Sequence, residues 1–295
     1  MPEPPPNPRV TVITPAYNAG ATLLESVTSA LAQTIAEIEV IVVDDGSEQP
    51  AADALAAVDD RRLRVLRTRQ NQGVSAARNI ALRAARAPVV AQLDADDLWR
   101  PDHLEGALPA FDDPAVGMAY TNVEIIGTPL LDRAIAVRTP DDGLPRWVSD
   151  RSQHPVDDLQ RLYSVNPIPA PGALMRTGAV RAVGGYPRWL SVGEEYFVYI
   201  KLKRAGWRIA YVDRMSAVYR WPEPGRGVSF DARRGARENL KLFSVLMLST
   251  PDEPAIRRRL IGELRNVVKT NVPGSVAVAR AVSGALGRGR RRADP

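Results

Sequence analysis

The chain has 295 residues, of which 45% are hydrophobic and 25% charged, with a formal net charge of +5; this composition is typical of a folded globular protein. It contains no cysteine and only two histidines, which excludes disulfides, cysteine-ligated zinc, thiol nucleophiles and three-histidine metal centres. Because we find neither a signal peptide nor an apolar run of about 20 residues, we expect a cytoplasmic protein without a membrane span.

The first hundred residues alternate between apolar runs and segments with helical spacing. Residues 1–8 form a proline-rich arm that we expect to be disordered. Apolar, β-branched runs then predict strands at 10–14, 39–43, 63–67 and 88–93. Apolar residues at helical spacing predict helices at 21–33, 51–58 and 74–86. This alternation predicts an α/β fold with a mostly parallel, doubly wound sheet and helices on both faces.

Polar and acidic residues directly follow three of these strands. The segments are Pro15–Asn18, Asp44–Ser47 and Asp94–Asp97. Ligands of doubly wound sheets bind beyond the carboxyl ends of the strands, so we expect one crevice with an aromatic ring and five carboxylates. Carboxylates crowded in this way need a cation between them, and an Asp-x-Asp pair can share Mg²⁺ or Mn²⁺.

Each of these segments also has a purely structural interpretation. Asp44–Ser47 alone is typical of a turn, and Asn18 is suited to capping a helix. Neither GxGxxG nor GxxxxGK[ST] follows any predicted strand, which argues against a dehydrogenase or a P-loop protein. The common location of the three segments favours a metal–carboxylate site that holds a diphosphate.

Four segments together resemble one known family. The runs VTVITPAYN, EVIVVDDGS, NQGVSAARN and VVAQLDADD, with Pro101 beyond the last, resemble the GT-A glycosyltransferases of the family 2 type, over roughly residues 9–220. The resemblance implies a GT-A (Rossmann-like) fold. Within it we expect a nucleotide-sugar-binding half at 9–122 and an acceptor-binding, catalytic half at 123–230. C-terminal helices and a basic tail at 231–295 would follow.

The resemblance also implies roles for residues at the strand ends. Pro15, Tyr17 and Asp45 would hold the nucleotide base, with the Tyr17 ring as a stacking face and Asp45 accepting the imide N–H of uracil. Asp44 is suited instead to bracing its turn.

The resemblance places the metal and the diphosphate next to the DADD segment. Asp96 would ligate Mn²⁺ or Mg²⁺ directly, and Asp94 would bind either the metal shell or the ribose, with Ala95 between them in the donor site. Arg78 would assist the phosphates; pairing with an acid on the helix surface is its other interpretation.

The expected general base lies at the start of a helix that we predict from Glu194 to about Ala205. Family members usually have Glu-Asp there, and the Asp is the base. The resemblance therefore implies Glu195 as the base, with Glu194 as the alternative. Both acids also suit a helix N-terminus, where the dipole favours negative charge.

Two family features are missing from this chain. The histidine that often follows Tyr-Arg is absent, because Tyr219-Arg220 precedes Trp221-Pro222, so a histidine metal ligand is not expected. Arg226 is a candidate to hold phosphates on a closing loop in its place. The QxxRW pattern of processive synthases is absent too, which favours the addition of a single sugar.

Positive charge gathers at the carboxyl end. Residues 255–295 contain ten Lys or Arg and two acids, a net charge of +8, which leaves −3 for the first 254 residues. This end is suited either to solvent or to peripheral contact with anionic lipids at the inner face of a membrane. It lacks aromatic stacking residues, so we expect no nucleic-acid partner.

The sequence therefore predicts an inverting, metal-dependent transfer of one sugar from a nucleotide diphosphate sugar, with UDP as the expected nucleotide. The acceptor would be the hydroxyl of a sugar or a lipid-linked glycan, in cell-surface polysaccharide, glycolipid or secondary glycan synthesis. Two alternatives stay open: a nucleotidyltransferase, although TPAYNAG does not resemble its glycine-rich, basic phosphate loop, and a catalytically silent homologue that binds nucleotide sugars.

Overall fold

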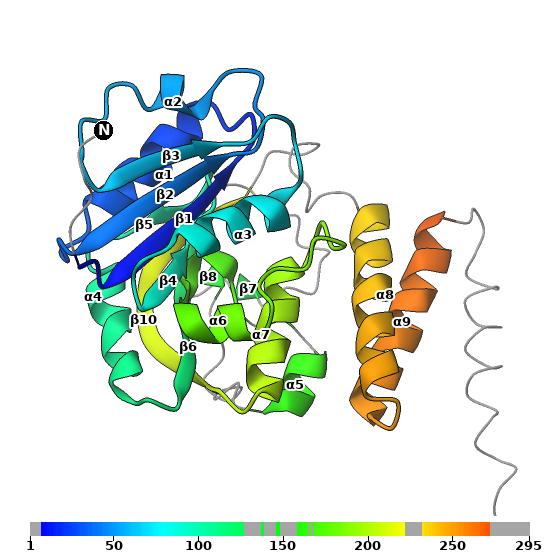
Figure 1. Ribbon diagram of the computed structural model, residues 1–295. Helices are drawn as coiled ribbons and strands as arrows, with labels where there is room; N and C mark the ends of the chain where they lie inside the picture. Colours follow the sequence, from blue (N-terminus) through cyan, green and yellow to red (C-terminus); the bar gives the residue numbers. More distant parts are fainter. Residues whose placement is uncertain are drawn as a thin grey trace, which may run out of the picture.

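The computed structural model describes residues 7–126, 137–138, 146–147, 158–164, 166, 168–221 and 232–271. Most of the predicted arm at 1–8, Arg226 and the tail beyond residue 271 lie outside these ranges. Figure 1 shows a curled sheet flanked by helices, with a pair of C-terminal helices at one side. Within the described residues, no helix combines the length and apolar character needed to cross a bilayer.

The first four predicted strands form the parallel part of the sheet, in the order β3-β2-β1-β4. Their bounds are Val10–Ala16 (β1), Ile38–Asp44 (β2), Leu63–Arg67 (β3) and Val89–Gln92 (β4). Every residue of β2 is buried, as expected for a strand with both faces covered. The carboxyl ends of β1, β2 and β4 consequently meet at one edge of the sheet.

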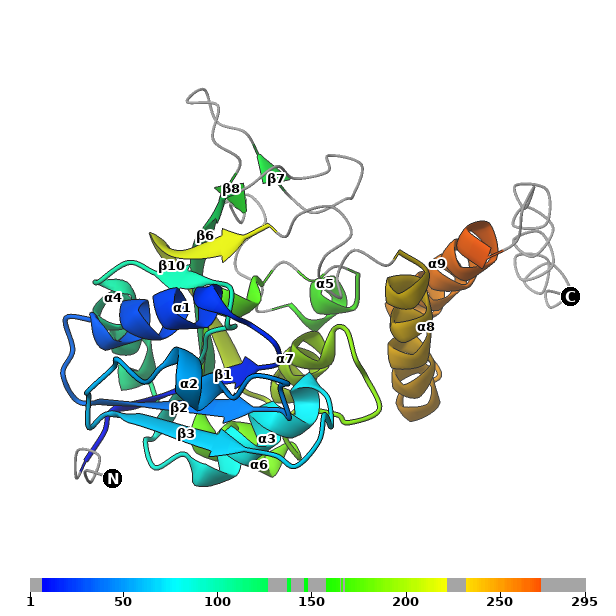
Figure 2. The ribbon, with the colours of Figure 1, turned by 90° about the horizontal axis from the view of Figure 1, so that it is seen from above.

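The second half of the sheet is mixed. The strand β9 (Ala173–Arg176) runs antiparallel to both β4 and β6 (Val116–Ile126), and β10 (Arg208–Arg220) pairs with β6 in parallel. The short β5 (Leu98–Trp99) closes the far edge against β10, and a ribbon of β7 (Val137–Arg138) and β8 (Arg146–Trp147) extends from β6 (Figure 2). The α/β class is confirmed, but the parallel arrangement ends at β4 because β9 enters in the opposite direction.

Alternate residues of β1 face different helices. Val10 and Val12 belong to the buried cluster that contains Leu23 and Val27 of α1 (Ala21–Leu31). Ile13 belongs instead to the cluster with Ala77 and Ala81 of α3 (Val74–Ala84). Helices therefore cover both faces of the sheet, as the two-residue period of a strand requires. The predicted helix at 51–58 is shorter than expected, since α2 spans Ala51–Ala54.

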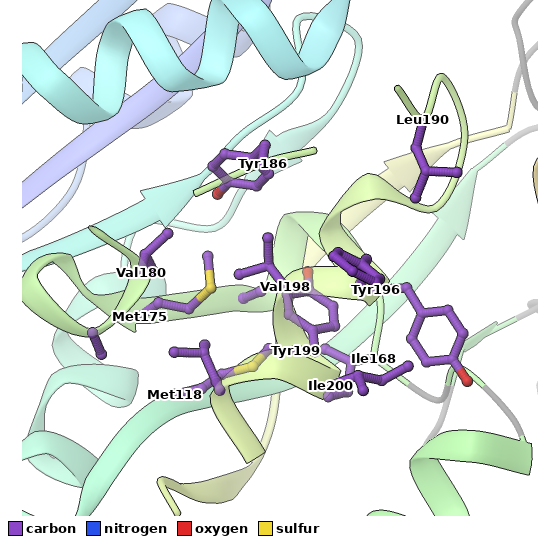
Figure 3. Close-up of a cluster of buried hydrophobic side chains, with 14 of the residues drawn as sticks. Met118, Ile168, Met175, Val180, Tyr186, Leu190, Tyr196, Val198, Tyr199 and Ile200 are labelled. Carbon is purple, nitrogen blue, oxygen red and sulfur yellow. The ribbon is translucent and has the colours of Figure 1, made fainter. Parts of the chain in front are cut away.

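Four further helices lie in the second half of the molecule. They are α4 (His103–Ala107), α5 (Leu159–Ser164), α6 (Thr177–Ala182) and α7 (Glu194–Arg204), with 3₁₀ turns at Leu108–Asp112 and Ala170–Gly172. Figure 3 shows Val198 and Tyr199 of α7 among Met118 of β6, Met175 of β9 and Val180 of α6. This core fixes α7 on the sheet and places its first residues, Glu194 and Glu195, near the carboxyl ends of β1, β2 and β4.

Two helices form the predicted C-terminal extension. They are α8 (Ala232–Ser249) and α9 (Pro254–Asn271), which pack against each other. Phe243 of α8 meets the ring of Tyr196 of α7 edge-on, with 6.3 Å between centroids. The extension therefore joins the main core. The predicted boundary between residues 122 and 123 falls inside β6, and the division into donor and acceptor halves stays a prediction.

We predict that Gly46→Ala destabilises the fold by at least about 2 kcal/mol. Gly46 has a φ of +75°, and an added Cβ would lie 2.6 Å from the carbonyl carbon of Gln70. Gly178→Ala is the matched control, because its Cβ would meet nothing within 4 Å. Urea unfolding of both variants measures the difference; equal stabilities would contradict the strained turn.

Candidate active site

A cavity of about 1120 Å³ opens at the carboxyl ends of β1, β2 and β4. It brings together nine residues that the sequence assigned to the site, all but Arg226, which lies outside the described residues: Pro15, Tyr17, Asp45, Arg78, Asp94, Ala95, Asp96, Glu194 and Glu195. Asp45 and Asp96 thus face one hollow, as a shared donor site requires. Their individual roles stay predictions.

Asp44 braces the turn after β2. One carboxylate oxygen accepts from the N–H of Ser47 at 2.9 Å and the other from that of Ala51 at 3.0 Å. Burial alone would raise the pKa of Asp44, but these hydrogen bonds hold it below its ordinary value. The contacts of Asp44 therefore agree with the bracing role that the sequence suggested for it.

Asp45 holds the segment that leads into α3. Its carboxylate accepts from the Thr68 hydroxyl at 3.0 Å and from the backbone N–H groups of Gln72 at 2.9 Å and Gly73 at 2.7 Å. These contacts use much of the acceptor capacity of a carboxylate. Asp45 therefore has a structural task that the sequence did not reveal, in addition to lining the cavity.

The segment after β1 is tied to the segment after β2. The backbone N–H of Asn18 donates to the Ser47 hydroxyl at 3.0 Å, and the Asn18 side-chain oxygen accepts from the N–H of Glu48 at 2.9 Å. Asn18 therefore does not cap α1, whose N-cap is Gly20. Tyr17 is 51% exposed, so its ring is available to a ligand in the cavity.

The last two acids of the DADD segment, Asp96 and Asp97, lie in different surroundings. Asp96 is exposed within the cavity wall, where desolvation in the concave site and the negative charge of Asp94 raise the pKa of Asp96 to about 6. Asp97 is fully buried and accepts from the backbone N–H of Arg220 in β10 at 3.0 Å. Asp97 therefore links the segment to β10, and Asp96 is the acid offered to a ligand.

Arg78 of α3 is the centre of the site. Its side chain is 3% exposed, and its guanidinium forms ion pairs with Asp94 at 2.6 Å and with Glu194, while Glu195 lies 3.9 Å away. Burial favours the uncharged form, but the charges of Asp94 and Glu194 raise the pKa of Arg78 above its ordinary value. The acid-pairing interpretation of Arg78 is correct, although the arginine is buried rather than on the helix surface.

The two glutamates at the start of α7 differ in environment. Glu194 is buried against Arg78, whereas the side chain of Glu195 is 19% exposed and lies farther from the guanidinium. Burial and the neighbouring charge of Glu194 raise the pKa of Glu195 to about 8. A carboxyl group tuned in this way is suited to proton transfer near neutral pH.

The carboxylates of the cavity are suited to a hard divalent ion that also binds a ligand. Within the described ranges, no three His, Cys, Asp or Glu residues are placed to enclose a metal. Asp94 and Asp96 instead supply two carboxylates on one wall, and desolvation together with the charge of Asp94 raises the pKa of Asp96, as expected for a carboxylate that a cation would stabilise. Mg²⁺ and Mn²⁺ accept such partial protein coordination, completed by phosphate oxygens and water.

Several lining residues were not found from the sequence. Trp189 and Trp221 add aromatic surface, and α8 contributes Arg234, Glu238 and Lys241 to the same cavity. Nothing in the amphipathic pattern of α8 distinguishes these side chains from ordinary solvent-facing ones. Trp221 occupies the region where the family often has its histidine.

Residues 11–184 match the model of the family described as Glycosyl transferase family 2. The chain belongs to this family. It is therefore a glycosyltransferase, and the match favours sugar transfer over nucleotidyl transfer.

Relatives of this family 2 chain act in polysaccharide synthesis. The succinoglycan biosynthesis protein ExoO of Rhizobium meliloti (strain 1021) is 27% identical over 261 residues, which cover 85% of this chain and 69% of ExoO. The UDP-Glc:alpha-D-GlcNAc-diphosphoundecaprenol beta-1,3-glucosyltransferase WfgD of Escherichia coli is 35% identical over 117 residues, or 40% of this chain and 46% of WfgD.

Solved structures confirm the GT-A fold of this family 2 chain. S. aureus TarS 1-349 in complex with UDP-GlcNAc superposes with a TM-score of 0.64 at 18% identity, over 88% of this chain and 72% of that one. The mannosyltransferase PcManGT from Pyrobaculum calidifontis, in complex with GDP-Man and Mn2+, also superposes with a TM-score of 0.64, at 21% identity. The superposition covers 98% of this chain and 81% of PcManGT.

We predict that Arg78→Met destabilises the protein by about 3–5 kcal/mol at pH 8, since it leaves buried carboxylates without their cation. The loss should shrink toward pH 5, because Glu195, whose pKa burial raises to about 8, is protonated there and one of the repelling charges is removed. Arg83→Met, at an exposed position of the same helix, is the control. Urea unfolding at both pH values measures the effect; a pH-independent loss would show that lost packing, rather than charge, dominates.

Proposed function

We propose that this chain is an inverting, metal-dependent glycosyltransferase that moves one sugar from a UDP-sugar to an acceptor hydroxyl. The observation that carries the proposal is the bridge made by Arg78, which joins the metal-side carboxylate Asp94 to the glutamate pair of α7 within one cavity. The carboxylate that would bind the metal and the glutamates that would accept the proton are thereby held next to each other.

The donor would lie along the acidic wall. Tyr17 offers its exposed ring to the base, and Pro15 and Asp45 line the same part of the cavity. Asp96 and Asp94 would hold Mn²⁺ or Mg²⁺. When bound, the ion supplies Lewis-acid stabilisation of the departing diphosphate. The UDP-GlcNAc complex of TarS supports a uridine donor. Because PcManGT is in complex with GDP-Man, GDP-sugars are the donors to compare with UDP-sugars.

Glu195, rather than Glu194, would be the general base. Glu194 is buried and engaged in the ion pair with Arg78, so it is less accessible to an acceptor hydroxyl. Glu195 is more accessible, and burial raises its pKa to about 8, so its carboxylate accepts a proton more strongly than an ordinary glutamate does. It would take the proton of the acceptor hydroxyl while that oxygen attacks the anomeric carbon. Direct displacement by the acceptor inverts the configuration there.

The acceptor would be a sugar or a lipid-linked glycan. The name of WfgD specifies a diphosphoundecaprenol-linked acceptor, and ExoO is named for succinoglycan biosynthesis. Arg257, Arg258 and Arg265 are exposed on α9, which supports peripheral contact with an anionic membrane surface. Such contact would place the cavity near a lipid-linked acceptor at the cytoplasmic face.

We predict that Asp96→Ala and Glu195→Gln impair different steps. Asp96→Ala should weaken Mn²⁺-dependent binding of UDP by more than about tenfold, because it removes a metal ligand. Glu195→Gln should lower turnover by about 10²–10⁴-fold while leaving UDP binding intact, because it removes only the base.

Calorimetric titration of UDP with Mn²⁺, and UDP release from a panel of UDP- and GDP-sugars, separate these two effects. Asp112→Ala and Glu37→Gln change exposed acids away from the cavity and are the matched controls. If Asp96→Ala binds UDP and Mn²⁺ as the wild type does, the metal assignment is wrong. Turnover by Glu195→Gln at the wild-type rate would refute the assignment of the base.

We predict that turnover at saturating donor rises with pH and reaches half its maximum near the pKa of Glu195, at about 8. The base acts only when deprotonated, so the rate should fall about tenfold for each pH unit well below this value. Initial rates of UDP release between pH 5.5 and 9.5 measure the profile. The midpoint should be the same with Mg²⁺ and Mn²⁺; a midpoint that follows the metal would assign the titration to metal-bound water instead.

A further inference from the structure

Helix α8 contacts the loop that immediately precedes the catalytic helix α7. Glu238 is 5% exposed, and one of its carboxylate oxygens accepts from the backbone N–H of Ser191 at 2.9 Å. The other oxygen accepts from Lys241 at 2.7 Å. Arg234 adds a second link, since its Nε donates to the Ser191 hydroxyl at 3.1 Å. Ser191 is therefore held at both its backbone and its side chain by one helix.

The loop at 188–193 is clamped from the opposite side as well. The Ser75 hydroxyl at the start of α3 lies 3.4 Å from the carbonyl oxygen of Leu190, to which it donates. The Leu190 side chain is 3% exposed and belongs to the same buried cluster as Leu242 and Phe243 of α8. The loop is thus held by contacts with α3, which carries Arg78, and with α8.

The end of this loop sets the direction in which α7 begins. Gly193 is the N-cap of α7, in the left-handed conformation with φ 78° and ψ 19°. A Cβ at Gly193 would lie 3.8 Å from the Leu242 side chain, so α8 also packs against this residue. Glu194 and Glu195 follow directly. A shift of the loop therefore moves both carboxyl groups relative to Arg78 and the cavity.

A buried carboxylate is costly unless it is paired and hydrogen-bonded. Hydrogen bonds from Lys241 and Ser191 outweigh burial and hold the pKa of Glu238 below its ordinary value. Glu238 is therefore a charged acceptor aimed at one backbone N–H of the loop. An apolar residue would fill this helix position without contacting that N–H.

We propose that Glu238 is a positioning residue of the active site, which fixes the 188–193 loop through Ser191 and thereby places Glu195 for proton transfer. The proposal rests on the proposed role of Glu195 as the base. It makes α8, which lies outside the family match at 11–184, part of the catalytic unit.

The test compares Glu238→Ala, Glu238→Gln and the control Arg237→Gln, which changes an exposed residue next to Glu238 on α8. UDP release from UDP-GlcNAc and UDP-glucose with Mn²⁺ gives kcat, UDP titration gives Kd, and amide hydrogen exchange reports on residues 190–198. Glu238→Ala should lower kcat by about tenfold or more and change the Kd of UDP by less than about twofold, since misplacing a base spares donor binding.

The same variant should speed exchange at residues 190–198. Glu238→Gln should recover part of kcat and of the protection, because its side-chain oxygen can still accept from Ser191, and Arg237→Gln should match the wild type. Should Glu238→Ala lack a cooperative thermal transition, Glu238→Asp gives the same readouts, because it keeps the charge and shortens the reach.

Wild-type kcat in Glu238→Ala would overturn the proposal, as would unchanged exchange at residues 190–198. The proposed function fails separately, when the wild type releases no UDP from any UDP- or GDP-sugar with Mn²⁺. In that case, hydrogen exchange still shows whether Glu238 holds the loop, and the link to catalysis is refuted.

Discussion

A single buried guanidinium holds the two sides of the cavity together. Arg78 extends from α3 between Asp94, which follows β4, and Glu194, which begins α7. Without this cation, three carboxyl groups would face one another in a poorly solvated site, and their repulsion would oppose the packing of α7 against the sheet. The ion pairs therefore stabilise the fold and hold the end of β4 and the start of α7 in one cavity.

The residues around Arg78 explain how much of the site could be predicted from sequence. Asp45, Asp94 and Asp96 directly follow buried apolar strands, so local pattern and the geometry of parallel strands suffice to place them at one edge. The pairing of Arg78 with Glu194 joins residues 116 positions apart. No local periodicity encodes such a contact, and the alanine-rich spacing of α3 predicted only a helix with an arginine on it.

The same reasoning explains the sheet. Strands β1 to β4 were predicted within a few residues because each is a short apolar run between helical segments. The direction of β9 depends on which edge of β4 is left open and on how the intervening chain crosses the molecule. These are tertiary properties, so the change from a parallel to a mixed sheet was not predicted. The contacts of Glu238 were missed for the same reason, since a buried acid on an amphipathic helix has no sequence signature.

The neighbouring glutamates of α7 show how one helix start can serve two purposes. Successive residues on a helix point in directions about 100° apart, so Glu194 can face Arg78 while Glu195 turns toward the open cavity. Glu194 forms the ion pair with Arg78, while burial and the charge of Glu194 together raise the pKa of Glu195. The longer side chain at position 195, compared with the Asp usual in the family, extends the reach by one methylene. The fixed start of α7 at Gly193, held by α8, determines where that longer side chain can place its oxygen atoms.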